Sequence, residues 1–175
     1  MNRKEAEEFI SFENKNPLAQ LWLDLGCGTG LFTLALAARL PLGSKIIAID
    51  KDEKALSKIP ATENDVVIQT MAADFVSDAL EVKNVDGILM ANSLHYVKDK
   101  ETLLRKVISS MNTNGVFLIV EYDRKAGNQW VPYPLTIDAA NALFKNLGYS
   151  GFHVLNKRRS RFGGDMYAAI IKKFR

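Results

Sequence analysis

The sequence predicts an α/β fold: a single doubly wound, Rossmann-like, mostly parallel sheet of seven strands with a C-terminal antiparallel hairpin. Short apolar runs alternate with helical patterns between residues 21 and 122, as in parallel strands joined by right-handed crossovers. A glycine-rich turn follows the first of these runs. The last two runs leave no room for a crossover helix between them, so we expect them to pair antiparallel.

The elements of the first half are bounded by glycines and prolines. The run LWLDL precedes the glycine-rich turn, which favours a buried strand. The following LFTLALAARL is apolar on all sides and ends at a Pro-Leu-Gly turn, which predicts a helix packed on the sheet. Pro60 ends a second, shorter helical pattern. We therefore expect strands at Leu21–Leu25, Lys45–Ile49, Val66–Gln69 and Asp86–Met90, and helices at Leu31–Leu40 and Asp52–Lys58.

The second half departs from this alternation near its end. Apolar residues at helical spacing precede an Asn114-Gly115 turn, which leads into a fifth strand. A further helical pattern ends at Gly148, and two strands follow with Arg158–Asp165 between them. We expect helices at Lys98–Met111 and Thr136–Leu147, and strands at Val116–Tyr122, His153–Lys157 and Met166–Lys172.

Length and composition indicate one folded domain. The chain has 175 residues, 47% of them hydrophobic and 25% charged, values typical of globular proteins. One Cys excludes an internal disulfide, and with only two His residues it argues against a Cys/His metal cluster. No apolar run approaches the roughly 20 residues of a membrane span, and the N-terminus is charged rather than apolar. We expect a cytoplasmic protein without a metal or a membrane partner. Its segments are an N-terminal helical segment (residues 1–19) and the main domain (residues 20–175).

Charge is distributed unevenly along the chain. Residues 1–150 contain 16 basic and 19 acidic side chains, whereas residues 151–175 contain 7 basic and 1 acidic. A basic C-terminal segment attracts phosphate-rich partners through long-range electrostatics. The alternative, which we favour, is a solvated hairpin whose Lys and Arg side chains face water, because nucleic-acid-binding domains usually carry a larger basic excess.

The strongest local signal is the run Asp24-Leu25-Gly26-Cys27-Gly28-Thr29-Gly30. Glycines at alternate positions let backbone N–H groups approach a ligand where a Cβ would collide. The loop lies between a predicted strand and a helix N-terminus, where unpaired N–H groups favour polar or anionic ligand atoms. Asp50 ends the second strand, where a carboxylate accepts hydrogen bonds from the ribose hydroxyls of a nucleoside. The sequence therefore predicts a nucleoside-binding loop rather than a simple tight turn.

The glycine spacing distinguishes between two cofactor classes. The dinucleotide fingerprint is G-x-G-x-x-G. Here glycines occupy positions 26, 28 and 30, and Leu31 stands where the third dinucleotide glycine belongs. This spacing argues against a nicotinamide cofactor, although the acid at position 50 fits either class.

The run DLGCGTG with its acid-ended second strand resembles the nucleoside-binding half of class I S-adenosylmethionine-dependent methyltransferases. The likeness continues through Ala72-Ala73-Asp74-Phe75 and VDGILMANSLHYV, and covers roughly residues 20–175. A reversed final strand is typical of that family. The resemblance implies S-adenosylmethionine as cofactor, S-adenosylhomocysteine as product, and a small-molecule acceptor with an O, N or C nucleophile.

The same resemblance implies a role for each site residue. Asp24, Gly26 and Gly28 hold the methionine end, with Cys27, Thr29 and Gly30 completing the loop. Asp50 binds the ribose, and the aliphatic part of Lys51 covers the adenine, where the family usually has an apolar residue. Asp74 and the backbone of Phe75 bind the adenine edge, and Asn92 faces the sulfonium. Two alternatives stay open: Asp74 as an N-cap, and Asn92 as a loop residue bonded to its own backbone.

His95 is the candidate catalytic residue. It follows the fourth strand at the carboxyl edge of the sheet, where ligands bind in open α/β folds, and an imidazole suits a general base. Methyl transfer requires a base only when the acceptor arrives protonated. The alternatives are that His95 lines the cofactor pocket or caps the next helix.

Two further segments are candidates for covering the site. The loop Asp123–Leu135 carries Trp130 and Tyr133 among prolines, and loops of this length are often lids or binding loops; Trp130 instead anchoring the loop to the core is equally open. The stretch Arg3–Phe12 has an apolar helical face that covers the pocket mouth or packs on the sheet.

Alternative functions remain at this stage. A nicotinamide-dependent oxidoreductase and a noncatalytic nucleoside-binding protein both use this fold. The sequence NSLHY lacks the Pro-Pro-aromatic arrangement with which amino-directed nucleic-acid methyltransferases hold a flipped base, so we expect no nucleic-acid partner. Nothing in the sequence predicts the oligomeric state.

Overall fold

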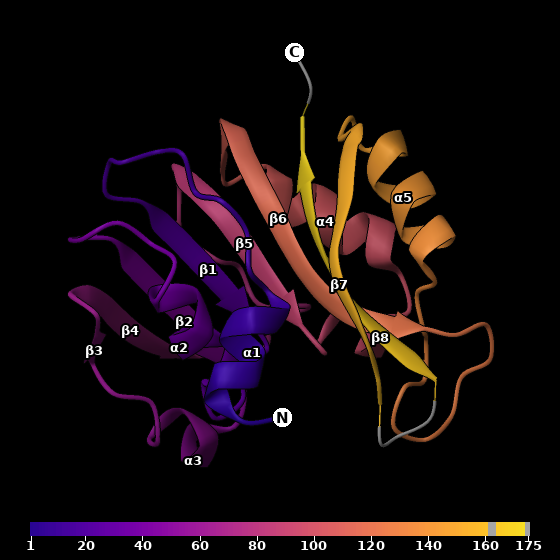
Figure 1. The fold of residues 1–175 in the computed structure, drawn as a ribbon, viewed down its shortest axis with the longest axis horizontal. Helices are drawn as coiled ribbons and strands as arrows, with labels where there is room; N and C mark the ends of the chain where they lie inside the picture. The colour runs from indigo at the N-terminus through magenta and orange to yellow at the C-terminus, as the bar shows by residue number, and fades with distance from the viewer. Residues whose placement is uncertain (161–163, 174–175) are drawn as a thin grey trace.

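Four parallel strands form the first part of the sheet. These are β1 (Leu21–Leu25), β2 (Lys45–Asp50), β4 (Val66–Ala72) and β5 (Val85–Ala91), and the apolar residues of all but β4 are buried on both faces. The computed structural model describes residues 1–160 and 164–173. In that part of the chain the strand order is β3-β4-β2-β1-β5-β6-β8-β7 (Figure 1).

The order of the strands reverses direction beside β1. The chain runs outward from β1 through β2 to β4, then returns to place β5 on the other side of β1. In open α/β sheets, ligands bind at the carboxyl ends of the strands that flank such a switch point. The fold thus directs attention to the residues that follow β1, β2, β4 and β5.

The predicted α/β fold with a mostly parallel sheet is confirmed, with one addition. All seven expected strands are present, and an eighth, β3 (Thr62–Glu63), pairs antiparallel with β4. The two residues between them, Asn64 and Asp65, both have positive φ, so they form a tight hairpin turn. A strand of two residues carries no periodicity, which is why the apolar pattern misses it.

The C-terminal hairpin is also confirmed. Strand β6 (Met111–Asp123) pairs parallel with β5 and antiparallel with β8 (Asp165–Lys172), and β7 (Gly151–Arg159) pairs antiparallel with β8 at the sheet edge. Of the predicted connection between the two hairpin strands, residues 161–163 lie outside the described residues.

The predicted Asn114-Gly115 turn is a bulge within β6 instead. Met111 pairs with Val85 and Val116 with Gly87, so five residues of β6 advance while β5 advances two. Asn112 stabilises the bulge, since its amide donates to the Asn84 carbonyl (3.1 Å) and to Asp86 Oδ1 (2.7 Å). A bulge and a turn use the same residue types, which explains the error.

Helices cover both faces of the sheet (Figure 1). Helices α1 (Arg3–Phe9) and α2 (Leu31–Ala37) contribute to one apolar core, and α4 (Lys100–Ile108) and α5 (Ile137–Asn146) to the other. The short α3 (Glu53–Leu56) packs beside β2 and β4, and a 3₁₀ turn, η1 (Leu94–Tyr96), follows β5. No helix in the described part of the chain is long and apolar enough to cross a bilayer.

Helix α1 packs on α2 and is hydrogen-bonded to the edge strand β7. Its apolar residues Ala6 and Phe9 are buried against α2 in a shared core. The Asn156 amide on β7 donates to the carbonyls of Glu8 (3.1 Å) and Phe9 (3.0 Å) at the end of the helix. The helix within the predicted segment 1–19 therefore packs over α2 and reaches the edge strand β7.

Candidate functional site

The glycine loop after β1 lies close to the residues at the ends of β2 and β5. Gly26, Gly28 and Gly30 have φ values of 78°, 54° and 84°, a region that favours glycine. A Cβ added at Gly26 would lie 2.5 Å from the Ser93 Cβ, which follows β5. The Gly26 and Cys27 N–H groups both donate to the Ile49 carbonyl, at 2.8 and 3.1 Å. The loop thus joins the ends of β1, β2 and β5.

Asp50 holds the loop from the end of β2. Its Oδ2 accepts the Gly28 N–H at 2.8 Å, and its Oδ1 accepts the Asp52 N–H at 3.0 Å. Each carboxylate oxygen keeps acceptor capacity beyond one N–H. Asp50 therefore fixes the loop while remaining able to accept from a ligand.

A cavity of about 570 Å³ opens beside this loop at the carboxyl ends of the strands, within the usual range for small-molecule sites. Six of the predicted cofactor residues line it: Gly26, Asp50, Lys51, Asp74, Phe75 and Asn92. Its remaining lining comes from Ala73, Val76, Ser93, Tyr96 and Val97. The predicted residues Asp24, Cys27, Gly28, Thr29, Gly30 and His95 are not among its lining residues.

Asp24 lies behind the loop as a buried carboxyl group. Its Oδ2 accepts the Thr33 hydroxyl at 2.6 Å, and its Oδ1 has no hydrogen-bond partner among the described residues. Burial raises the pKa of Asp24 to about 7, with a smaller contribution from the negative charge of Asp50, while the Thr33 hydrogen bond opposes the rise. An unpartnered buried oxygen of this kind is a place for a donor from a ligand.

Cys27 and Thr29 differ from the other loop residues. The Cys27 side chain packs with the small apolar cluster beside α3, and burial raises the pKa of its thiol. The thiol is therefore a packing group rather than a nucleophile. Thr29 is exposed at the tip of the loop.

A lysine from α4 organises the segment that follows β4. Lys106 Nζ donates to the carbonyls of Phe75 (3.1 Å), Val76 (3.0 Å) and Asp78 (2.6 Å). Within the same segment Asp74 Oδ1 accepts the Val76 N–H at 2.9 Å. The Asp78 N–H donates to the Asp74 carbonyl at 2.8 Å, so Asp74 does cap the single turn that follows it, and it also lines the cavity.

Asn92 stands at the end of β5 in a strained conformation. Its φ is 56°, and its Oδ1 is buried without a partner among the described residues, as is Ser93 Oγ. Its N–H donates to the Val120 carbonyl at 2.8 Å. Positive φ at a non-glycine residue and orphaned polar atoms both concentrate at functional sites.

His95 is buried in a pair with Glu121 from β6. Its Nδ1 lies 2.7 Å from Glu121 Oε2, and its backbone N–H donates to Glu121 Oε1 at 3.1 Å. The ring contacts those of Tyr96 and Tyr122, with centroid distances of 4.4 and 5.5 Å. His95 does not cap the next helix, because Asp99 accepts the Thr102 N–H there.

The loop after β6 places Val131 and Leu135, rather than the Trp130 ring, in the core. Val131 and Leu135 are buried, whereas Trp130 is 57% exposed and Tyr133 41% exposed. The Tyr133 N–H donates to the His95 carbonyl at 3.0 Å, and Lys100 Nζ lies 5.6 Å from the centroid of the Tyr133 ring. The anchoring role considered for Trp130 is therefore carried by its neighbours.

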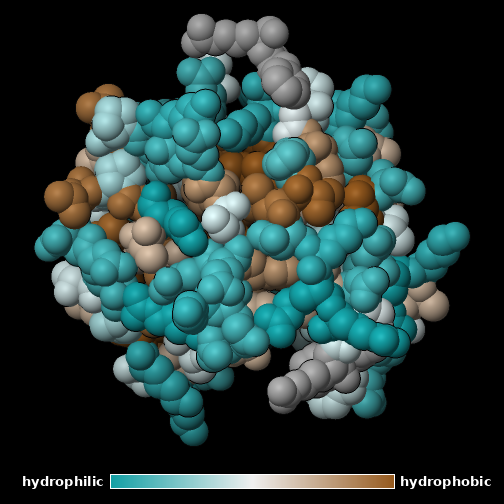
Figure 2. All heavy atoms as spheres, viewed as in Figure 1, coloured by the Kyte–Doolittle hydropathy of each residue, from teal (hydrophilic) through white to brown (hydrophobic). Residues whose placement is uncertain are grey.

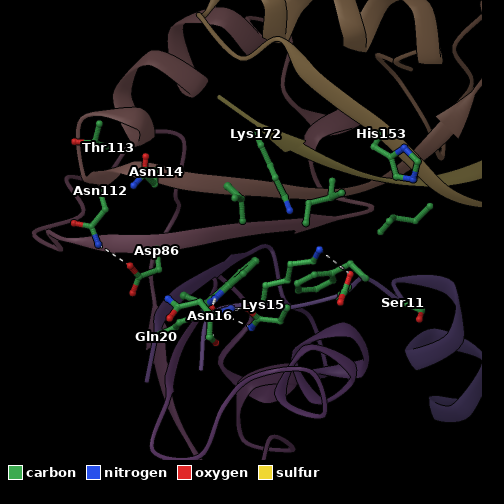
Figure 3. A pocket seen from close by; sticks show the side chains of 17 residues that line it. Ser11, Lys15, Asn16, Gln20, Asp86, Asn112, Thr113, Asn114, His153 and Lys172 are labelled. Carbon is green, nitrogen blue, oxygen red and sulfur yellow. Dashed lines mark hydrogen bonds and ion pairs between the residues drawn. The ribbon is translucent and has the colours of Figure 1, made fainter. Parts of the chain in front are cut away.

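A larger cavity of about 940 Å³ lies toward the starts of β1, β5 and β6, away from the carboxyl ends of the strands. Its side chains come from the 11–20 segment and from β1, β5, β6, β7 and β8, and Lys172 points into it (Figure 3). Figure 2 shows hydrophobic surface across the middle of this face, bordered by polar residues. None of the predicted site residues lines this cavity, so it plays no part in the site described above.

Among the described residues no group of three or more His, Cys, Asp or Glu side chains is placed to hold a metal ion.

The family of the chain is shown by comparison with known proteins. Residues 23–115 match the model of the methyltransferase domain family. The chain belongs to this family, which confirms the resemblance to class I S-adenosylmethionine-dependent methyltransferases, and with it the predicted class of enzyme and the predicted cofactor at the level of the family.

Curated relatives extend beyond this chain. A carboxy-S-adenosyl-L-methionine synthase of Hydrogenovibrio crunogenus is 26% identical over 82% of this chain and 58% of its own length. An uncharacterized methyltransferase of Mycobacterium tuberculosis is 27% identical over 59% of this chain and 51% of its own length. The chain thus spans a little over half the length of these relatives.

Solved structures show the same fold. Magnesium protoporphyrin IX methyltransferase from Synechocystis, crystallised with S-adenosylhomocysteine, superposes with a TM-score of 0.72 at 14% identity, covering 98% of this chain and 83% of that one. An S-adenosylmethionine-dependent methyltransferase from Aquifex aeolicus gives 0.61 at 14% identity, covering 96% and 88%.

The cavity at the glycine loop fits such a cofactor. The space beside Gly28 is open, since an added Cβ there would meet no atom within 4 Å, and the carboxylates of Asp50 and Asp74 offer acceptors for hydroxyl and amino groups. The orphaned oxygens of Asp24, Asn92 and Ser93 are buried nearby.

Sequence reasoning missed two residues that shape this site. Lys106 lies about 30 residues from the carbonyls it binds, and Glu121 lies 26 residues from His95. Lys106 carries no motif. An acid within the apolar run VFLIVEY, however, is a signal, because a buried carboxylate needs a partner.

We expect Lys106→Met to loosen residues 75–78, since it keeps an unbranched apolar side chain and removes three hydrogen bonds from a charged donor. The affinity for S-adenosylhomocysteine should weaken by about 1–3 kcal/mol, and amide hydrogen exchange in residues 75–78 should accelerate. Arg105→Met is the matched control, because Arg105 is exposed and its ion pair in the described part of the chain is with Glu101 on the same helix. Equal behaviour of the two variants would contradict the role of Lys106.

Proposed function

We propose that this protein transfers the methyl group of S-adenosylmethionine to a small-molecule acceptor through an O, N or C nucleophile. The observation that carries the proposal is the cavity at the switch point, bordered by Gly26, Asp50 and Asp74. The methyltransferase names of the relatives and structural neighbours support it, and the magnesium protoporphyrin IX methyltransferase is named for a small-molecule acceptor. The predicted cytoplasmic location and the predicted division at residues 19 and 20 stay predictions.

The residues would act mainly by binding and alignment. Asp50 would accept the ribose hydroxyls, Asp74 and the Phe75 backbone would bind the adenine edge, and the aliphatic part of Lys51 would cover the ring. Asp24 and the loop backbone at Gly26 and Gly28 would hold the methionine end, with Cys27, Thr29 and Gly30 keeping the shape of the loop.

The chemistry requires little from the protein beyond this. When bound, the cofactor supplies a sulfonium-activated methyl group, which passes to the nucleophile of the acceptor while the sulfur keeps the bonding pair as a neutral thioether. Asn92 at the end of β5 would face this centre and, together with Tyr96, limit the access of water. Alignment and water exclusion are the principal sources of rate in such a displacement.

Binding of S-adenosylhomocysteine tests the assignment of Asp50. We expect micromolar binding by isothermal titration that Asp50→Ala largely abolishes, because each hydrogen bond to a charged acceptor contributes about 1.5–3 kcal/mol, or about tenfold to hundredfold in affinity for each ribose hydroxyl. Asp50→Asn keeps an oxygen for the Gly28 N–H and separates loop collapse from loss of the ribose contact. Glu53→Ala, an exposed acid one turn away, should bind normally. Undiminished binding in both Asp50 variants would rule out this site.

The pKa of Asp24 predicts a pH dependence of the same binding. Because that pKa is raised to about 7, Asp24 is largely neutral below pH 7. Binding of the ligand's ammonium group then requires that the Asp24 carboxyl group lose its proton. The affinity should therefore rise by up to about tenfold per pH unit below the pKa and level off above it. Asp24→Asn should bind weakly and with a flat profile between about pH 5.5 and 8. A wild-type profile as flat as that of the variant would show that Asp24 does not meet the ammonium group.

For His95 the geometry supports a positioning role more directly than the predicted role of base. The ring lies between Tyr96, which lines the cofactor cavity, and Tyr122 on β6, and it lines neither that cavity nor the smaller one beyond Asn92. Held by Glu121, the ring would keep η1 and the end of β6 in place around the reacting centre. A base role would require Nε2 to reach the acceptor.

A double-mutant cycle measures this positioning role without an acceptor. His95→Ala and Glu121→Ala should each lower the free energy of unfolding by roughly 3–5 kcal/mol, because each leaves a buried partner unpaired. The double variant should be less unstable than the sum of the two. Urea denaturation measures all three. Small and nearly additive changes in the free energy of unfolding would contradict a structural pair. His95 would then again be the candidate general base.

A further inference from the structure

A second, smaller cavity adjoins the cofactor cavity at Asn92. It has a volume of about 190 Å³ and lies between α1, the start of α2, the end of β6 and the β7–β8 hairpin. Asn92 lines both cavities. If the cofactor occupies the first as proposed, this second cavity lies on the far side of the residue that would face the methyl group, where an acceptor must bind.

The walls of this cavity are apolar on one side. Leu31 and Phe32 come from the first turn of α2, Tyr122 from β6 and Met166 from β8. Phe32, Tyr122 and Met166 are largely buried. Such walls suit the apolar or aromatic body of a small molecule.

The other side of the cavity is cationic. Arg158 and Arg159, the last residues of β7, both line it, and Glu5 from α1 is the acid that faces them. Arg158 lies 3.6 Å from Glu5 with both side chains partly exposed, a pair of little strength. The other oxygen of Glu5 accepts the Asn2 N–H at 2.7 Å, so that carboxylate already closes the N-terminal turn of α1.

The guanidinium groups are therefore available to a ligand. No ion pair involves Arg159 in residues 1–160 and 164–173, and Arg158 can exchange its weak contact for a better one. Arginine binds carboxylates and phosphates through two parallel N–H donors, a geometry that lysine does not provide. Two arginines on one side of a cavity whose other side is apolar indicate one anionic group on a small apolar ligand.

We propose that the methyl acceptor carries an oxyanion group, a carboxylate or a phosphate, which Arg158 and Arg159 bind while the apolar body lies between Phe32 and Tyr122. The nucleophile would then be directed toward Asn92. This inference rests on the proposed function and names the substrate class of the same site. It also assigns a ligand to two of the basic residues of the C-terminal segment, for which the sequence analysis favoured exposure to water.

The test uses benzoate and phenyl phosphate as probes of the oxyanion and benzamide as their neutral counterpart. Each is titrated into the full chain saturated with S-adenosylhomocysteine, with binding followed by ligand-observed NMR. Benzoate or phenyl phosphate should bind at least about tenfold more tightly than benzamide, since charged hydrogen bonds are stronger than neutral ones. The tighter of the two acids tells whether a carboxylate or a phosphate is the better fit.

Variants locate the binding. Arg158→Gln with Arg159→Gln should weaken acid binding by roughly tenfold to hundredfold and leave benzamide binding unchanged. Lys157→Gln removes one positive charge from the neighbouring residue, which does not line the cavity, and should behave as the wild type, whereas Arg158→Gln alone, which also removes one charge, should weaken acid binding. Affinity for S-adenosylhomocysteine, measured in every variant, should stay constant.

The outcomes separate this inference from the proposed function. A wild-type protein that fails to bind S-adenosylhomocysteine contradicts the proposed function, and this inference with it. Where S-adenosylhomocysteine binds normally, three results would contradict the inference alone. The acids do not bind, benzamide binds as tightly as they do, or the arginine and lysine variants behave alike.

Discussion

The close approach of the β1–α2 loop to the residues after β5 is the constraint on which the rest of the site depends. At Gly26 a single added carbon would lie 2.5 Å from the Ser93 side chain, so no other residue fits without moving β5 or the loop. The Ile49 carbonyl and the Asp50 carboxylate hold this loop through three N–H groups. The ends of β1, β2 and β5 therefore meet at one point, and the cavity is the space that this meeting leaves.

The elements that the sequence predicts well are those whose signals are local. Continuous apolar runs predict the central strands because both faces of a parallel sheet are buried, and the alternate glycines predict the loop because its backbone requires positive φ. Six of the residues singled out for the cofactor line one cavity. They do so because the carboxyl ends of adjacent parallel strands lie along one edge, which topology alone guarantees.

What the sequence does not predict depends on contacts between distant segments. The bulge in β6 uses the same Asn-Gly pair as a turn, and only its pairing with β5 distinguishes the two. Lys106 shapes the segment after β4 from a helix that the chain reaches about 30 residues later. His95 sits where the motif suggests a catalytic group, yet its position depends on Glu121 from the next strand. Each of these cases is settled by packing between elements, which a linear pattern does not encode.

The two cavities divide between different parts of the chain, and this division bears on specificity. Every residue that lines the cofactor cavity falls within residues 23–115, the part that matches the family. Apart from Asn92 and the start of α2, the smaller cavity is lined from outside that part, by α1 and by strands β6, β7 and β8. Helix α1 and the β7 edge can therefore change without disturbing the glycine loop or Asp50. Relatives that share the cofactor half carry little information about the acceptor, so its chemistry has to be sought in the side chains that α1 and the hairpin place around Asn92.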